Sequence, residues 1–281
     1  MLTSIRGLLA ATLLAGSSLA AVPALADETD PPSDVTITGS AVIVSQYRFR
    51  GLAQSDNKPA VQGALTLSHS SGFYISAWGS SASAGAGPIN IGGTEIDITG
   101  GWTKGLGDSG VTVDIGAIGY IYPGAPLGNY YEIYGSLAKT FGPVTAKVGV
   151  NVAPGQEVFN YNWTSAKRSN VYTFGNLSAG IPGTPITLTG QLGYTSGGFA
   201  WGKDYLDYSI GASVKWKSLT LGIALVGTNV SKDDIRTGFA SYINPLCPGT
   251  PAAAAACVAT QTTYWHRMSK TTAVASLTAS F

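Results

Sequence analysis

The residues of this chain that could do chemistry are charged side chains set at alternating positions within short apolar segments. Alternation with a period of two is typical of β-strands, because successive side chains point to opposite faces. If such strands form a barrel wall in a membrane, the apolar face meets lipid and the polar face lines the interior. The residues predicted to line this interior as a pore are Arg48, Arg50, Glu95, Asp97, Asp114, Glu132 and Asp207.

Strand direction predicts the depth of these charges. Arg48 and Arg50 end a strand that runs toward the outer face, whereas the acidic residues other than Asp114 begin strands that return from it. One interpretation is an eyelet in which arginines and carboxylates on different walls tune ion selectivity. The other is that opposite charges pair across the lumen and brace or plug the barrel. A further interpretation for Arg50, with Lys167 and Arg168, is binding of lipopolysaccharide phosphates.

Catalysis, metal binding and cofactor binding find little support in the residue types. The chain has two histidines, His69 and His266, far apart in sequence, whereas nucleophilic catalysis needs a nucleophile, a base and an orienting group together. No ligand set for a metal is recognisable. We therefore expect no enzyme, no metal site and no cofactor.

The N-terminal residues predict export. A single charge at Arg6, a short apolar stretch and an Ala-Leu-Ala motif before Asp27 are typical of a signal peptide spanning residues 1–26. An N-terminal membrane anchor is the alternative, but the apolar run is shorter than the roughly 20 residues that a spanning helix needs. Because an exported chain meets an oxidising compartment, Cys247 and Cys257 are predicted to form a disulfide rather than two free thiols in a mobile loop.

Composition excludes several protein classes. The chain has 16 Lys and Arg and 15 Asp and Glu, so removal of Arg6 with the signal leaves it formally neutral, and no nucleic-acid partner is expected. It is rich in Gly, with 37, and has 14 Tyr and 6 Trp, but no apolar run after the signal is long enough for a membrane helix. Since only helices and closed barrels satisfy the backbone inside a bilayer, these features favour a barrel.

The alternating pattern predicts an all-β fold, a transmembrane antiparallel up-and-down β-barrel of about twelve strands. It follows a periplasmic segment at 27–34 and spans 35–281. The strands are predicted at 35–49, 60–68, 73–80, 94–104, 111–122, 130–140, 144–153, 170–180, 185–194, 204–216, 219–228 and 272–281.

Loop lengths distinguish a membrane barrel from a soluble sandwich, which would also alternate. Short connections alternate with long ones along the whole chain, and the longest, at 229–271, is predicted to be an extracellular loop. Outer-membrane barrels sort their loops in this way, with short periplasmic turns and longer extracellular loops. The terminal Phe281 on an alternating strand is similar to the signal that the outer-membrane assembly machinery reads.

Four segments carry a family resemblance: the region from Ser45 to Ser81, then TEIDITGGWTKGLGD, VDIGAIGYIYPG and NYYEIYGSLAKTFG. They resemble the TorF-type porins, a family also called the Gcw_chp group of bacterial outer-membrane proteins of unknown function. The resemblance implies a barrel in the bacterial outer membrane. Its strong part is about the first half of the mature chain, and the last loop looks peculiar to this sequence.

These observations predict a porin-like channel for passive diffusion of ions or small polar solutes. Twelve strands about 4.7 Å apart and tilted by about 40° give a backbone diameter of roughly 24 Å, which leaves on the order of 10 Å inside. The alternative is a non-conducting surface or adhesin-like barrel that acts through its outer loops. Expected partners are outer-membrane lipids, lipopolysaccharide, the assembly machinery and small solutes; the oligomeric state is left open.

Overall fold

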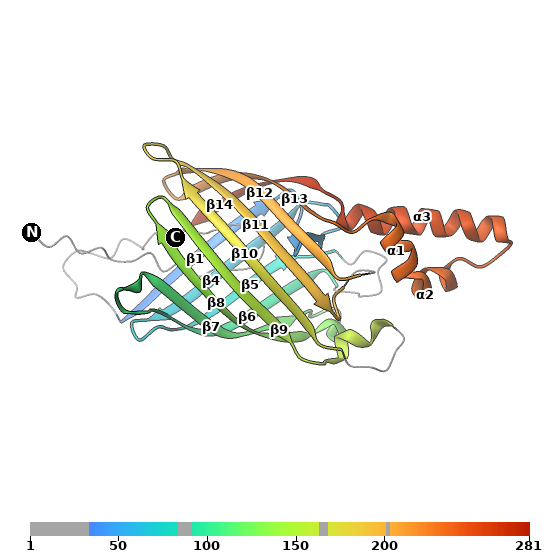
Figure 1. Ribbon diagram of the computed structural model, residues 1–281, viewed down its shortest axis with the longest axis horizontal. Coiled ribbons are helices and arrows are strands. Elements are labelled where there is room, and N and C mark those ends of the chain that lie inside the picture. Colours follow the sequence, from blue (N-terminus) through green and yellow to red (C-terminus); the bar gives the residue numbers. More distant parts are fainter. Residues whose placement is uncertain (1–33, 84–91, 163–167, 201–202) are drawn as a thin grey trace, which may run out of the picture.

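The computed structural model describes residues 34–83, 92–162, 168–200 and 203–281, which form a closed barrel with helices at one end (Figure 1). The predicted signal peptide and most of the predicted periplasmic segment lie outside the described residues. The twelve strands of the wall are β1 (Val35–Val44), β4 (Ala60–His69), β5 (Phe73–Ser81), β6 (Thr94–Gly105), β7 (Val111–Ile121), β8 (Tyr130–Phe141), β9 (Val144–Ala153), β10 (Asn170–Gly180), β11 (Ile186–Gly197), β12 (Tyr205–Trp216), β13 (Leu219–Thr228) and β14 (Thr272–Ser280).

The wall is an up-and-down sheet in which each strand pairs antiparallel with its neighbours in the chain. Closure comes from β1, which pairs with β4 on one side and with β14 on the other, placing Ala41 opposite Ala279. The predicted all-β barrel of twelve antiparallel strands is therefore confirmed. Along β1, Ile37 and Ile43 are 55% and 60% exposed on the outside, whereas Ser40 and Val42 are buried inside.

The two ends of the barrel differ as the loop lengths predict. Connections at one end, called here the turn end, are short and include the 3-10 turn η1 (Gly107–Ser109). The opposite end, called the helix end, carries the long connections, which include η2 (Pro126–Gly128) and η3 (Glu157–Asn162). In Figure 1 the C-terminal Phe281 lies toward the turn end and the helices project from the other.

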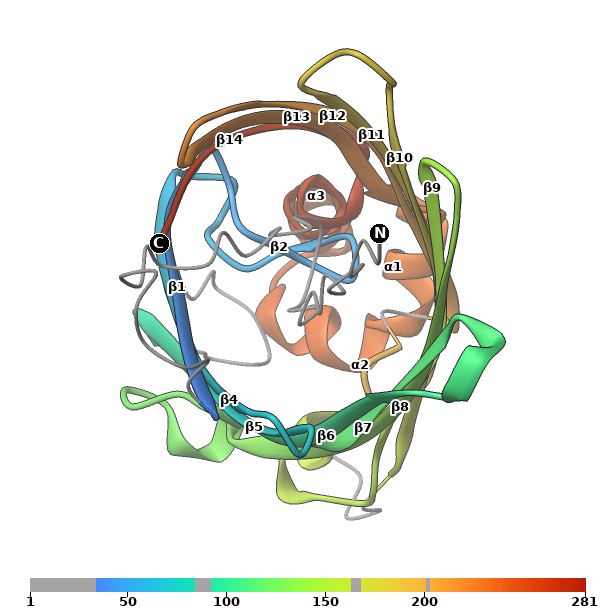
Figure 2. The same cartoon turned by 90° about the vertical axis from the view of Figure 1, so that its left-hand side faces the viewer.

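The segment after β1 departs from the prediction of one strand at 35–49. The strand ends at Val44, and the chain enters the lumen as a hairpin of β2 (Arg48–Phe49) and β3 (Leu52–Ala53) (Figure 2). Residues 45–59 are called the inner hairpin below. Its two turn residues, Arg50 and Gly51, have positive φ angles of 47° and 79°, as a two-residue turn between twisted strands requires.

Tyr47 and Phe49 consequently do not face lipid, as continuation of the alternation predicted. The Tyr47 side chain is 3% exposed and lies 5.4 Å, ring to ring, from Trp78, while the Phe49 ring lies 5.8 Å from that of Tyr120. Both rings face into the barrel because the hairpin has left the wall. Alternation shows which side chains share a face but not where the chain turns inward.

The predicted extracellular loop at 229–271 is largely helical. It contains α1 (Lys232–Gly238), α2 (Ala240–Ile243), the 3-10 turn η4 (Asn244–Leu246) and α3 (Pro251–Ser269), which together are called the helical cap. Helix α1 begins with a capping box formed by Ser231 and Asp234. Helix α3 begins with Thr250 as its N-cap and Pro251 in its first turn, before a run of alanines.

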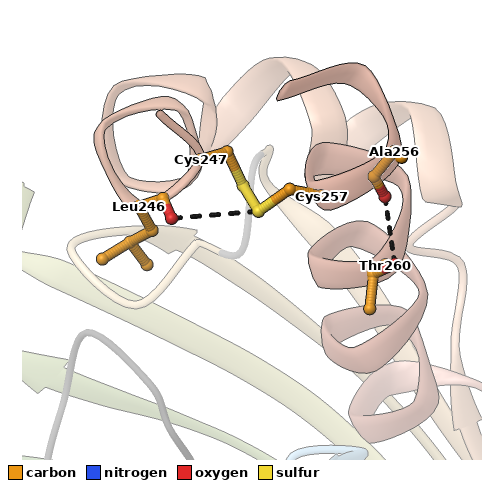
Figure 3. The surroundings of a disulfide bond; sticks show 5 residues. All are labelled: Leu246, Cys247, Ala256, Cys257 and Thr260. Atoms are coloured by element: carbon orange, nitrogen blue, oxygen red, sulfur yellow. Dashed lines mark hydrogen bonds between the residues drawn. A yellow bond between two sulfur atoms is a disulfide. The ribbon is translucent and has the colours of Figure 1, made fainter. Parts of the chain in front are cut away.

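The predicted disulfide between Cys247 and Cys257 is confirmed; it joins the residue after η4 to the second turn of α3, with their Cα atoms 5.5 Å apart (Figure 3). Cys247 is buried in a cluster with Ile243 and Trp265 that also includes Leu52 of the inner hairpin. Within the described part of the chain, no helix is both long enough and apolar enough to cross a membrane.

Candidate functional site: the lumen at the helix end

The inner hairpin crosses the lumen and docks on the far side of the wall. Arg50, at its tip, donates from Nη2 to Glu132 Oε2 at 2.5 Å. Glu132 lies on β8, whereas the hairpin leaves the wall between β1 and β4, on nearly the opposite side of the ring. The side chains of Arg50 and Glu132 are 4% and 0% exposed, so this ion pair is buried.

Aromatic rings enclose the guanidinium of Arg50. Its central carbon lies 4.2 Å from the ring centroid of Tyr172 and 4.6 Å from that of Phe49, distances at which a cation is attracted to the ring faces. Near it, Tyr120 stacks on Tyr130 with 4.2 Å between centroids. These tyrosines come from the inward positions of β7, β8 and β10.

Glu132 is also held from the wall. Its Oε2 accepts hydrogen bonds from Tyr120 Oη at 3.1 Å and from Asn151 Nδ2 at 3.0 Å. A buried carboxylate needs such partners, because a charge removed from water without them costs several kcal/mol. The wall thus holds the carboxylate in place to receive the arginine.

Arg48 joins the inner hairpin to the helical cap. Its guanidinium donates to Gln46 Oε1 at 2.8 and 2.9 Å, to Asn57 Oδ1 at 2.6 Å and to the carbonyl of Met268 at 2.7 Å. Met268 belongs to the last turn of α3, where a cation satisfies free carbonyls and complements the helix dipole. Arg48 lies inside the barrel as predicted, but its hydrogen bonds are structural.

The base of the inner hairpin has further bonds to α3. Arg267 pairs with Asp56 at 2.6 Å, and Asn57 Nδ2 donates to the carbonyl of Arg267 at 3.4 Å. The hairpin base and the C-terminal turn of α3 therefore form one hydrogen-bonded unit. The hairpin tip, in contrast, is held to the wall by Arg50.

The other predicted carboxyl groups lie in the same buried part of the lumen as Arg50 and Glu132, which is called the chamber below. Tyr122 Oη donates to Glu95 at 3.2 Å, and Asp207 accepts from Tyr172 Oη at 3.2 Å and Gln191 Nε2 at 3.0 Å. Asp97 lies between Trp78 and Tyr120 in the strand register, and neither of its carboxylate oxygens accepts a hydrogen bond from a described residue. Each of these three acids is 1% exposed.

Asp114 belongs to a separate group nearer the turn end. It lies 3.7 Å from Lys147 Nζ and accepts a hydrogen bond from Tyr74 Oη at 2.9 Å, while Tyr74 also bonds to Tyr134. The side chains of Asp114 and Lys147 are 15% and 12% exposed, more than the charges in the chamber above them.

All seven charged residues predicted to line the interior point into the barrel, and four acids gather with Arg50 at the helix end as strand direction predicted. Of the two interpretations, paired charges describe Arg50 and Glu132 in this structure. That these residues line a conducting pore stays a prediction. The sequence reasoning missed Asn151, Tyr172 and Gln191, although each occupies an inward position that the alternation of its strand could have shown.

Two other predicted features lie away from this chamber. His69 is at the turn end and His266 is on α3, so the structure does not bring them together. No group of three or more His, Cys, Asp or Glu able to hold a metal occurs among the residues that the structure describes. Phe281 is 63% exposed, and its backbone forms hydrogen bonds with Gly39. The ring of Phe281 occupies the space beside Gly39 that a Cβ atom would take.

A closed twelve-stranded sheet with an apolar outside and a polar interior defines the chain as a transmembrane β-barrel. Within that class it belongs to the Gcw_chp family, described as a bacterial protein of unknown function, whose model matches residues 28–244. Both cysteines and the whole of α3 lie beyond the matched range. No curated protein matches the chain.

Two solved porins share the fold. The NanC porin aligns with a TM-score of 0.52 and 10% identity over 87% of this chain and 98% of that one. The KdgM porin, solved in complex with disordered oligogalacturonate, aligns with a TM-score of 0.50 and 10% identity over the same shares of the two chains. At this identity the similarity is one of fold.

Proposed function

We propose that this protein is an outer-membrane channel through which ions or small polar solutes diffuse passively, with the inner hairpin as its constriction. The observation that supports this most directly is the contrast between the two sides of one closed wall. The outside is a belt of exposed apolar residues such as Ile210 and Leu221, whereas the inside carries charges and hydroxyls down to Asp114 and Lys147. A barrel that only anchored surface loops would not need a polar interior along its length.

The same proposal orients the barrel in the outer membrane of a bacterium. The turn end faces the periplasm and the helical cap faces outward, in keeping with the loop lengths of outer-membrane barrels. Export through the signal peptide at 1–26 precedes insertion, which the assembly machinery carries out after reading Phe281. Within the Gcw_chp family the chain belongs, in this proposal, to the TorF-type porins.

Lipids and lipopolysaccharide are the proposed surroundings of the wall. Arg168, at the helix end, is exposed and suits a phosphate of the outer leaflet. Lys167 lies outside the described residues. Arg50, which the sequence alone also allowed as a phosphate ligand, is instead buried against Glu132, so it is not part of this proposed contact.

The charges of the lumen favour cations over anions. Glu95, Asp97, Glu132 and Asp207 surround the chamber together with Arg50, while the second luminal arginine, Arg48, is held by neutral acceptors at the base of the hairpin. An acidic oligosaccharide such as the oligogalacturonate of the KdgM complex would meet repulsion here. We therefore propose that the channel prefers cations or dipolar solutes.

Single-channel recording on the refolded protein in planar bilayers tests the proposal. We expect discrete conductance steps and a reversal potential on the cation side under a salt gradient. Replacing Arg50 by Asn removes the charge that crosses the lumen while suiting the positive φ at this position, and it should raise conductance severalfold. Conservative replacement by Lys should leave conductance near the wild-type value.

A non-conducting surface protein is the second candidate. The observation that favours it is the burial of the charges of the chamber, which are nearly inaccessible at the end of the barrel that carries the disulfide-linked helical cap. If properly folded protein, recognised by a heat-modifiable band, gives no conductance in either wild-type or Arg50→Asn form, this second function is the better one.

A further inference from the structure

Arg50 is bound in the manner of a ligand, by Glu132 and Tyr172 of the wall and by the ring of Phe49 on its own hairpin. Its guanidinium is enclosed by the rings of Phe49 and Tyr172 and makes one hydrogen bond, from Nη2 to Glu132. Its other two nitrogens, Nε and Nη1, donate to no described residue although they are buried. A guanidinium has five donors, so this one uses few of the bonds it could make.

The way the inner hairpin is held allows the side chain of Arg50 at its tip to leave Glu132 while the base stays in place. The hairpin base is fixed to α3 through Arg48, Asn57 and Asp56. Arg50 lies two residues after Arg48 and six residues before Asp56, and it sits on the two-residue turn between β2 and β3. The side chain of Arg50 can therefore leave Glu132 without dismantling the hairpin base.

The chamber holds more carboxyl groups than Arg50 can bind. Neither oxygen of Asp97 accepts a hydrogen bond from a described residue. Asp207 lies within electrostatic range of Arg50 as well. A buried carboxyl group without donors is stabilised by a cationic donor brought beside it, so this chamber favours the entry of a further cation.

We propose that Arg50 occupies the place of the solute, and that the channel accepts small organic cations carrying a guanidinium group, which displace Arg50 from Glu132 and Tyr172. This inference rests on the proposed channel function and names its substrate class. A planar guanidinium has the geometry that one carboxylate and two aromatic faces recognise. The Asp97 carboxyl group, whose oxygens accept no hydrogen bond from a described residue, offers a second anchor during transit. Anionic solutes have no counterpart to these contacts.

Equilibrium binding of methylguanidinium to refolded full-length protein, measured by calorimetry at low ionic strength, tests the inference without requiring conduction. Because Arg50 competes for the site, we expect Arg50→Asn to bind methylguanidinium at least tenfold more tightly than the wild type. Adding Glu132→Gln to that variant should abolish the gain. Arg50→Lys, which keeps a competing charge, should stay near the wild type.

Two controls separate recognition from general attraction. Urea has the planar shape of guanidinium without its charge, and it should not bind to any variant in the same concentration range. Lys147→Met removes a different luminal cation, beside Asp114, and should leave methylguanidinium affinity within twofold of the wild type. A heat-modifiable band verifies folding of every variant.

The inference is overturned if Arg50→Asn binds no more tightly than the wild type, if Lys147→Met gains as much, or if potassium at equal ionic strength displaces methylguanidinium fully. Binding without any conductance would overturn the proposed channel function, including the passage of guanidinium compounds through the barrel. It would still support recognition of guanidinium at the Arg50 site. Conductance without binding would overturn this inference alone.

Discussion

Arg50 forms an ion pair with Glu132 inside the barrel, although its hairpin starts from the wall on nearly the opposite side from β8, which carries Glu132. This 2.5 Å contact is the one ion pair between the described inner hairpin and the described wall. Two properties make this possible. The hairpin supplies the reach, since β2 and β3 extend the chain inward from the end of β1. The wall supplies a carboxylate already held by Tyr120 and Asn151.

The first prediction concerns the stability of this pair. Glu132→Gln leaves the guanidinium of Arg50 buried without its counter-charge, which costs about 3–5 kcal/mol when one partner of a buried pair is removed. We expect a lower midpoint of urea unfolding in lipid vesicles. Adding Arg50→Met to Glu132→Gln should recover most of that loss, because both partners of the buried pair are then removed together. An equally stable Glu132→Gln single variant would mean that Arg50 reaches water in the folded protein.

The second prediction concerns Gly51, the other turn residue of the inner hairpin. Its φ of 79° suits glycine, and a Cβ here would lie 2.7 Å from the carbonyl oxygen of Gly227 and 2.5 Å from a side-chain carbon of Thr228. Gly51→Ala should therefore displace the hairpin tip and raise single-channel conductance toward that of Arg50→Asn. Gly107→Ala is the matched control, since Gly107 also has a positive φ but open space around its Cβ position. Equal conductance changes in Gly51→Ala and Gly107→Ala would contradict the idea that the position of the hairpin tip controls conductance.

The wall was predictable because one rule governs it. Residues 144–153, 170–180 and 219–228 form strands with the predicted bounds, since lipid on one side and a lumen on the other impose strict alternation. The inward direction of Glu132 and Asp207 followed from the same rule.

The inner hairpin and the helical cap were not predictable in this way. Tyr47 and Phe49 continue the alternation of β1, so the pattern contains no sign that the chain turns inward after Val44. What decides their position is packing against Trp78 and Tyr120, which are distant in sequence. The helical cap did carry local signals, because Thr250, Pro251 and the following alanines are typical of a helix start.

The third prediction concerns the disulfide. Reduction of Cys247–Cys257, or a Cys247→Ser/Cys257→Ser variant, should speed proteolysis of residues 244–257, because the link stabilises this segment by about 2–4 kcal/mol in the chain-entropy account. The barrel should keep its heat-modifiable band. Conductance should also stay within twofold of the oxidised protein, because Arg48 and Asp56 hold the other end of α3. A larger change in conductance would show that the disulfide-linked part of the cap itself controls the lumen.

The fourth prediction concerns Phe281. Its amide donates to the carbonyl of Gly39 at 3.0 Å, and its carbonyl accepts from the amide of Gly39 at 2.7 Å, so it adds the last pair of bonds to the seam between β14 and β1. Deleting Phe281 should slow insertion and leave periplasmic aggregates. Phe281→Leu keeps the backbone bonds and separates the two possible causes: slow insertion of this variant too would assign the effect to recognition of the aromatic ring. Normal outer-membrane levels of the deletion variant would contradict both causes, the loss of the backbone bonds to Gly39 and the loss of the recognised aromatic ring.

The fifth prediction concerns pH and the attachment of the helical cap. Asp234 bonds to Lys203 Nζ at 2.8 Å and to the backbone amide of its N-cap Ser231 at 2.8 Å. Partial desolvation alone would raise the pKa of Asp234, but the hydrogen bonds from Lys203 and Ser231 outweigh it and lower the pKa to about 2.

A depressed pKa means that the carboxylate stabilises the folded cap fully above the unfolded value of about 3.9 and loses this contribution as pH falls through 2. Hydrogen exchange of the amides in α1, corrected for intrinsic rates, should therefore quicken between about pH 4 and pH 2. Asp234→Asn removes the titrating group, so in this variant α1 should exchange faster at neutral pH and show no further acceleration in that window. Acceleration of equal size in Asp234→Asn would assign the acid sensitivity of the cap to another group.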